Sequence, residues 1–258
     1  MTIRAFLFLL LLLCKIITYA QSKESPSEKY LDRYNDLKEM QASIQIIDEV
    51  IDGLPLDSPD KQYFNVLKLM EYTNCCEWRA VDSLYYELNS YFELTQNKLM
   101  LSKLFSLYGT ALNAKGEYKQ ACSYLLEKIE LVPPSNETPQ MIAKHLNFKG
   151  AMFYELGFGY LQMEEWEEAR HYADRAIESL AEVKDTITLM HAYNLSGLIL
   201  KRSGHPEYAI ERYQRALELI HDHRNNSLGR IILQNIATLY SDMDLLDKAL
   251  EFSRKIFY

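Results

Sequence analysis

His221 and His223 stand one residue apart and are the side chains in this sequence whose type and spacing best suit a metal ion. Neutral imidazole is a common ligand of zinc, but a zinc site needs three or four protein ligands. No further obvious ligand lies close by, and the pair falls between two helical patterns. The sequence therefore predicts no metal and no cofactor.

Other chemistry-bearing patterns are equally incomplete. Gly157-Phe158-Gly159 lacks the third glycine of a phosphate-binding loop and follows no predicted strand. The zinc-protease helix, the nucleophile elbow and the paired-cysteine motif do not occur. We therefore predict that the protein is not an enzyme.

The composition indicates helices and an acidic surface. Of 258 residues, 48% are hydrophobic and 25% charged, whereas only 9 are Gly and 7 are Pro, too few for the many tight turns of a β-sandwich or barrel. The formal net charge of −8 repels phosphate backbones, so we expect no nucleic-acid partner.

Residues 1–20 have the pattern of a secretory signal peptide. Arg4 precedes an apolar run from Ala5 to Cys14, and small Ala20 ends the segment. The run is shorter than the about 20 residues of a membrane-spanning helix. We expect cleavage near Ala20 and export, most simply to a periplasm. The alternative is that the uncleaved N-terminal helix anchors the protein.

A pattern of small residues recurs four times along the chain. A large apolar residue is followed four positions later by a small residue, and twelve positions beyond that by an alanine. The small residue and the alanine of the four copies are Gly109 and Ala121, Gly157 and Ala169, Gly197 and Ala209, and Ala237 and Ala249. Small residues at these spacings let two antiparallel helices approach closely, so we expect these eight residues to pack the helix pairs.

The repeats divide the chain after the signal peptide into two parts. Residues 21–101 are expected to form N-terminal helices that include a degenerate repeat. Residues 102–258 are expected to form four repeats, at about 102–135, 150–183, 190–223 and 230–258, of which the last is incomplete.

In these motifs the chain resembles the tetratricopeptide repeat (TPR) family, in its exported bacterial type. The match is best at Leu156-Gly157-x-x-Tyr160, Trp166, Ala169 and Ala176. The resemblance implies an all-α solenoid of antiparallel helix pairs wound into a right-handed superhelix. It also implies that the first helix of each pair lines a concave groove that binds a protein or peptide.

Carrying the groove positions of the family onto this sequence gives a candidate binding surface. Its residues are Lys103, Asn113, Tyr154, Phe158, Gln162, His191, Asn194, Lys201, Arg202 and Gln234. This surface includes three positively charged residues of an acidic protein, Lys103, Lys201 and Arg202. A peptide with a carboxylate could be held there by charge-assisted hydrogen bonds.

Two functions follow from this reading. The first is a non-enzymatic scaffold that binds a protein or peptide in an exported compartment. The alternative is the periplasmic sensor region of a bacterial TPR-containing signalling or transcriptional regulator whose membrane and effector domains are missing. The pattern stops at Phe257-Tyr258 within the second helix of a pair, so self-association through an uncapped C-terminal end is a further expectation.

Overall fold

The computed structural model describes residues 44–257 apart from 56–57, 133–137, 184 and 222–225. In these residues all regular elements are α-helices, so the predicted all-α solenoid is confirmed. The segment predicted as a signal peptide lies outside the described residues. Among the helices that are described, none has the length and apolarity needed to cross a membrane.

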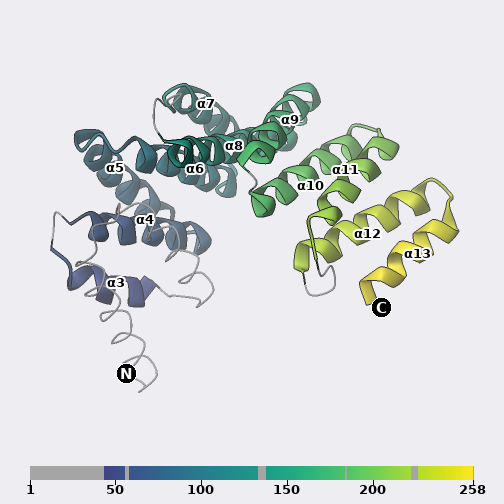
Figure 1. Cartoon of the computed structure of the whole chain (residues 1–258), viewed down its shortest axis with the longest axis horizontal. Coiled ribbons are helices and arrows are strands. Elements are labelled where there is room, and N and C mark those ends of the chain that lie inside the picture. Colours follow the sequence, from purple (N-terminus) through teal and green to yellow (C-terminus); the bar gives the residue numbers. More distant parts are fainter. Residues whose placement is uncertain (1–43, 56–57, 133–137, 184, 222–225, 258) are drawn as a thin grey trace, which may run out of the picture. The chain divides into compact units, whose positions relative to one another are not determined.

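The chain divides into two compact units between Thr95 and Gln96. The first unit contains α3 (Ile44–Asp52), α4 (Pro59–Asn74) and α5 (Trp78–Leu94). The second contains α6 (Lys98–Ala114), α7 (Tyr118–Ile129), α8 (Pro139–Gln162), α9 (Trp166–Val183), α10 (Thr186–Arg202), α11 (Pro206–Glu218), α12 (Ser227–Asp242) and α13 (Leu246–Phe257) (Figure 1).

One turn geometry joins the two helices of each pair. The pairs are α4 with α5, α6 with α7, α8 with α9, α10 with α11, and α12 with α13. Each turn holds one residue at positive φ, namely Cys76, Gly116, Glu164, Gly204 and Asp244. The next residue donates its N–H back to the carbonyl five positions earlier, as from His205 to Leu200 at 2.8 Å. Glycine adopts positive φ without steric cost, whereas Glu164 and Asp244 adopt it at a cost of about 1 kcal/mol each.

The first helix of each pair begins differently, with a side-chain cap. Asp185 Oδ1 accepts a hydrogen bond from the Thr188 N–H at 3.0 Å, and Asn226 Oδ1 accepts one from the Gly229 N–H at 2.9 Å. Ser58, Asn97 and Thr138 cap α4, α6 and α8 in the same way. Polar caps at these positions satisfy N–H groups that the helix leaves without partners.

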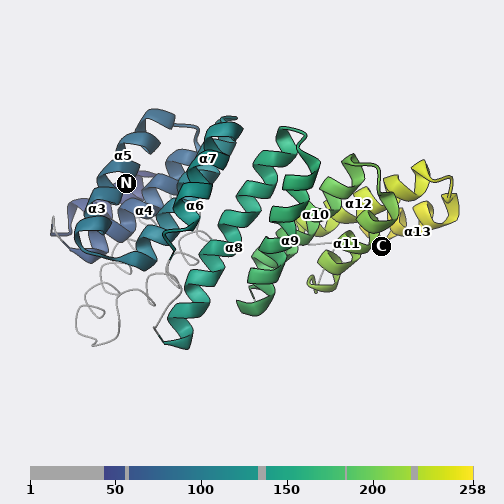
Figure 2. The same ribbon diagram turned by 90° about the horizontal axis from the view of Figure 1, so that it is seen from above.

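Within the second unit the helices follow a curve in chain order. The first helices α6, α8, α10 and α12 lie along its inner side, and the second helices α7, α9, α11 and α13 lie along its outer side (Figure 1). Figure 2 shows α8 to α11 side by side in the same order. The face of each first helix that is turned away from the second helices is therefore left on the inner side of the curve.

Core clusters of the second unit are shared between neighbouring pairs. Leu125 of α7, Met152 of α8 and Leu180 of α9 are 0% exposed and belong to one cluster. A second cluster joins α10 and α11 to α12 through buried residues such as Tyr213 and Ile232. Because consecutive pairs bury the same side chains, each pair depends on its neighbours for its core.

Candidate functional site

A stripe of accessible side chains runs along α10 with the spacing of one helix face. Ile187, His191, Asn194, Leu198 and Lys201 are exposed or half-buried, whereas most of the residues between them are buried. Their intervals of three and four residues place them above one another on the helix. This stripe is thus a continuous accessible face of α10.

The same repeat positions are accessible on α8 and α12. Tyr154, Phe158 and Gln162 are half-buried on α8, and Gln234 and Thr238 are exposed on α12. We call the accessible residues of α8, α10 and α12 at these positions the inner stripe. The structure thus brings together seven predicted groove residues, namely Tyr154, Phe158, Gln162, His191, Asn194, Lys201 and Gln234, with exposed Arg202 beside Lys201.

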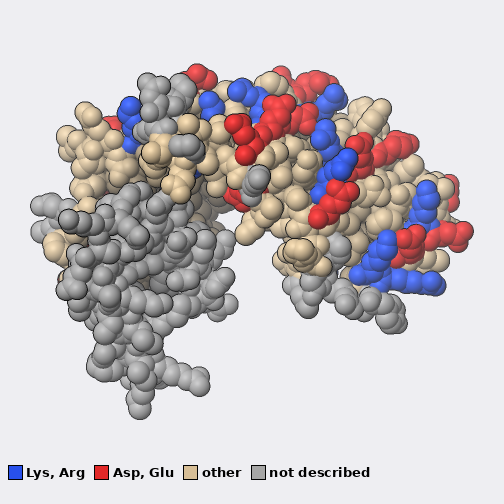
Figure 3. Space-filling model, viewed as in Figure 1, with Lys and Arg blue, Asp and Glu red and all other residues tan. Residues whose placement is uncertain are grey.

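The inner stripe differs in charge from the outer helices. The described stripe residues of α8 and α10 include no Asp or Glu, whereas on α12 exposed Asp242 stands at the repeat position of Gln162 and Arg202. Neither Lys201 nor Arg202 forms an ion pair with any described carboxylate. In the view of Figure 3, acidic and basic side chains gather over the outer helices, whereas the inner edge over α10 and α12 is largely uncharged. Two cations without an ion pair therefore lie at one end of the α10 part of the stripe, which has no carboxylate among its described residues.

The two predicted groove residues of α6 are placed differently. Lys103 and Asn113 are only 6% and 4% exposed. Asn113 Nδ2 donates a hydrogen bond to Glu155 Oε2 at 2.8 Å, and Thr110 Oγ1 donates one to Glu155 Oε1 at 2.8 Å. Asn113 is therefore engaged by α8 in this structure. Burial also lowers the pKa of Lys103 to about 8.

The Glu155 carboxylate was not among the residues that the sequence singled out. It occupies the repeat position of Leu195 on α10, which is buried among apolar side chains. A carboxylate at an apolar position of the repeat is the signal that could have identified it. Burial raises the pKa of Glu155, and the hydrogen bonds from Asn113 and Thr110 oppose that rise.

Replacing this carboxylate should change how stability depends on pH. The folded protein binds the Glu155 proton more tightly than the unfolded chain, so the free energy of unfolding falls as pH rises from about 4.3 through the raised pKa. Glu155→Gln removes this proton equilibrium and keeps an amide that can pair with Asn113 and Thr110. We expect the variant to gain stability relative to the native protein as pH rises from 4 to 8, measured by urea unfolding.

Glu178→Gln on the exposed side of α9 is the matched control for this measurement. It removes one carboxylate of the same type from a site in water. If Glu155→Gln and Glu178→Gln showed the same change of stability with pH, the buried carboxylate would not be the cause.

The predicted packing residues lie at the crossings within the helix pairs. A Cβ added at Gly157 would lie 3.1 Å from the backbone nitrogen of Ala173 and 3.2 Å from the carbonyl oxygen of Ala169. One added at Gly109 or Gly197 would meet the side chain of Leu125 or Tyr213. The alanines are buried as well, with Ala121, Ala169 and Ala209 at 0%, Ala237 at 8% and Ala249 at 9% exposed.

Metal ligation has no cluster to support it in the part of the chain that the structure describes. His221 lies there, just after α11, but His223 lies outside the described residues. The two glycines of Gly157-Phe158-Gly159 are buried in α8, where a Cβ at Gly159 would meet Cys122 Sγ at 2.7 Å. They serve helix packing in this structure.

The sequence profile of the tetratricopeptide repeat matches residues 149–220, which cover most of α8, all of α9 and α10, and α11. This segment of the chain contains tetratricopeptide repeats. A comparison with curated proteins gave no match.

Solved structures share the fold over most of the chain. BtubC (BKLC) from P. vanneervenii aligns with a TM-score of 0.66 and 14% identity over 90% of each chain. The apo form of RapI aligns with a TM-score of 0.63 and 13% identity over 76% of this chain and 68% of its own. Aspartyl phosphate phosphatase F from Bacillus subtilis aligns with a TM-score of 0.64 and 14% identity over 93% of this chain and 66% of its own. At these identities the likeness shows the fold alone.

Proposed function

We propose that this TPR protein is a non-enzymatic scaffold that binds an acidic, extended segment of a protein partner along the inner stripe. The observation that carries the proposal is that Lys201 and Arg202 form no ion pair with described residues and lie beside stripe residues of α8 and α10 that include no carboxylate, in a chain whose net charge is −8. The TPR fold supports a protein partner, because stacked helix pairs present a continuous surface to a long segment.

The stripe offers contacts of two kinds to such a segment. Ile187 is 68% exposed on α10, and half-buried Tyr154 and Phe158 present aromatic surface on α8. Gln234 carries an exposed amide that can donate to and accept from a peptide backbone. Lys201 and Arg202 then supply charge-assisted hydrogen bonds to carboxylates, which fix the register and orientation of the segment.

A charge reversal tests the proposal. Fluorescence anisotropy is measured with labelled 15-residue peptides that carry graded numbers of Glu, and crosslinking with mass spectrometry identifies the natural partner. We expect Lys201→Glu/Arg202→Glu to weaken binding of the acidic peptides roughly tenfold or more, because two attractive contacts become repulsive. The loss should shrink as salt concentration rises.

Arg215→Glu/Arg254→Glu is the matched control, since it makes the same change of net charge on the outer helices α11 and α13, where both arginines are exposed. This variant should bind the peptides within about twofold of the native protein. Equal loss in the two variants would show that only overall charge matters, and would remove the inner stripe as the site.

The compartment is a separate part of the proposal. The basic, apolar and small-residue pattern of residues 1–20 supports export with cleavage near Ala20, and an uncleaved anchor is the alternative. Fractionation of the native host followed by N-terminal sequencing distinguishes them. A chain that begins at Gln21 supports cleavage, whereas an intact Met1 in the soluble cytosol contradicts export.

The alternative function is that of a sensor region in a longer bacterial regulator. In that case the TPR scaffold would bind the molecule to which the regulator responds. This alternative keeps the inner stripe as the binding surface and differs only in what the chain is joined to. Coding sequence downstream of Tyr258 for a membrane helix and an effector domain would favour it over the free scaffold.

Self-association through the last helix pair stays a prediction. Leu250 of α13 is 56% exposed, whereas Ile210, at the same repeat position of α11, is 6% exposed because α12 packs on that pair. Light scattering compares the molar mass of the native protein in solution with that of the Leu246→Ser/Leu250→Ser variant. A monomer mass for both proteins would contradict self-association.

A further inference from the structure

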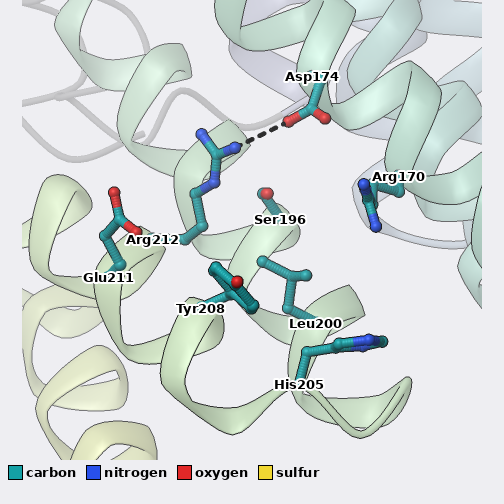
Figure 4. A pocket seen from close by; sticks show the side chains of 8 residues that line it. All are labelled: Arg170, Asp174, Ser196, Leu200, His205, Tyr208, Glu211 and Arg212. Carbon is teal, nitrogen blue, oxygen red and sulfur yellow. Dashed lines mark ion pairs between the residues drawn. The ribbon is translucent and has the colours of Figure 1, made fainter.

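A pocket of about 440 Å³ opens on the outer side of the second unit, away from the inner stripe. It lies between α9 and α11, with residues of α10 beneath them (Figure 4). Its lining comprises Arg170, Asp174, Ser196, Leu200, His205, Tyr208, Glu211 and Arg212. The volume is within the range of small-ligand sites, so a group the size of an amino-acid side chain fits inside.

The pocket exists because one repeat departs from the packing of its neighbours. At the preceding interface the corresponding space is filled by Cys122, Leu156, Tyr160 and Tyr172, which lie in one core cluster. At the following interface it is filled by Ile210, Ile236, Tyr240 and Phe252, again in one cluster. At the interface between α9, α10 and α11 these four positions hold Arg170, Ser196, Leu200 and Arg212.

The replaced residues include the aromatic pair that closes both neighbouring interfaces. The rings of Tyr160 and Tyr172 are stacked with centroids 5.4 Å apart, and those of Tyr240 and Phe252 are 5.5 Å apart. Leu200 and Arg212 stand in their place. Local departures from a consistent packing rule concentrate at functional sites, because apolar filling would be the more stable choice.

The charges in the pocket are unequally engaged. Arg212 Nη2 lies 3.3 Å from Asp174 Oδ1, so these two groups neutralise each other. Arg170 forms no ion pair with any carboxylate of the described residues. In Figure 4, Glu211 lies on the far side of Arg212 from Arg170 and His205. One guanidinium is thus available on the side of the pocket where His205 also lies.

From this geometry we propose that the outer pocket binds a carboxylate group, with Arg170 as its main ligand. The planar fork of a guanidinium matches the two oxygens of a carboxylate. Tyr208 and Ser196 add hydroxyl donors, and Leu200 offers apolar surface to a short aliphatic stem. A single unpaired cation with Glu211 at the rim favours a monoanion over a phosphate dianion. The carboxylate can belong to an acidic side chain of a protein or to a small free acid.

Isothermal titration calorimetry with N-acetylglutamate N-methylamide tests the proposal, with the glutamine analogue and inorganic phosphate as comparison probes. We expect the glutamate probe to bind and the glutamine analogue to bind at least tenfold more weakly. A peptide with one Glu is the second arm. Tighter binding of the peptide than of the small probe supports a protein source, and equal binding supports a free acid. Phosphate binding as tight as that of the glutamate probe would overturn the assignment.

Arg170→Ile is the decisive variant, because the neighbouring repeats carry Cys122 and Ile210 at this position and the fold already accepts an apolar residue there. We expect it to retain the native thermal midpoint and to lose at least tenfold in affinity for the glutamate probe. Arg215→Ile on the same outer side, where Arg215 pairs with Glu218 at 3.1 Å, should bind like the native protein. Unchanged affinity in Arg170→Ile would overturn the proposal.

The outer pocket and the inner stripe are tested independently. Lys201→Glu/Arg202→Glu leaves all the pocket residues in place, so it should bind the small glutamate probe as the native protein does. If peptides failed to bind the inner stripe, the pocket assignment would still stand. If Lys201→Glu/Arg202→Glu lost binding of the small glutamate probe, the pocket assignment would be wrong.

Discussion

Gly157→Leu is expected to destabilise the protein by about 3 kcal/mol or more, one of the largest effects of a single substitution in this fold. A Cβ at this position would already lie 3.1 Å from the backbone nitrogen of Ala173 and 3.2 Å from the carbonyl oxygen of Ala169. A flexible side chain could move aside, but these atoms belong to the backbone of α9. The three further carbons of leucine therefore require α8 and α9 to separate along their whole crossing.

Separation at this crossing would also disturb the neighbouring pair. Ala169 and Ala173 share a buried cluster with Leu195 and Ile199 of α10, all at most 2% exposed. Domains are stable by only about 5 to 15 kcal/mol, so the expected loss is a large share of the total. Guanidinium unfolding monitored by circular dichroism measures it.

Gln140→Leu is the matched control, because it adds a leucine to the first turn of the same helix at an exposed position. The free energy of unfolding of this control should lie within about 0.5 kcal/mol of that of the native protein. A difference of about 1 kcal/mol or less in free energy of unfolding between Gly157→Leu and this control would be no larger than an ordinary surface change. The close approach of α8 and α9 would then not be essential for stability.

The helix pairs could be predicted from the sequence because their signals are local. Gly157 with Ala169 and Gly197 with Ala209 stand at a fixed spacing, and Gly116 and Gly204 mark turns that require positive φ. Glu164 takes the same backbone conformation with an ordinary side chain. The turn is therefore imposed by the packing of the pair and only assisted by glycine.

Boundaries of the longest helix were harder to predict. The repeat pattern placed the start of the second repeat at about residue 150, whereas α8 begins at Pro139 after the cap Thr138. Proline at the first helical position with a threonine before it is a local start signal. The repeat spacing of 48 between Gly109 and Gly157, against 40 elsewhere, reflects this 24-residue helix.

The candidate site could be predicted only in part. Accessible positions of α10 follow from helical spacing, since His191, Asn194 and Lys201 share one face of a single helix. Contacts between helices do not follow in this way. The hydrogen bond from Asn113 to Glu155 joins residues 42 positions apart in the sequence. The burial of Asn113 therefore depends on how α6 packs against α8.

The outer pocket illustrates the same limit. Arg170, Ser196 and Arg212 can each be seen in the sequence to depart from the apolar residues of the other repeats. That the three departures meet at one interface depends on stacking, which brings α9 of one pair against α10 and α11 of the next. Comparing repeat positions across interfaces, rather than within pairs, is what identifies the pocket.

Tyr213→Ala is expected to cost about 3 to 5 kcal/mol, the second large effect, because the ring is a large and completely buried side chain of the second unit. Tyr213 is 0% exposed in the cluster that joins α10 and α11 to α12. Its hydroxyl is buried and finds no hydrogen-bond partner in the described part of the protein. Tyr213→Phe should therefore be more stable than the native protein by about 1 kcal/mol, since it removes an unsatisfied polar group and keeps the ring.

The ring and Gly197 should behave as one unit. A Cβ at Gly197 would lie 2.6 Å from the Tyr213 ring, so Gly197→Ala alone should destabilise the protein by about 1 to 3 kcal/mol. In a Tyr213→Ala background the ring is absent, and the same change should instead favour the helix by up to about 1 kcal/mol. A double-mutant cycle by urea unfolding measures this reversal of sign. Additive effects would mean that α10 and α11 do not meet through this contact, because only a direct contact makes the cost of the methyl group depend on the ring.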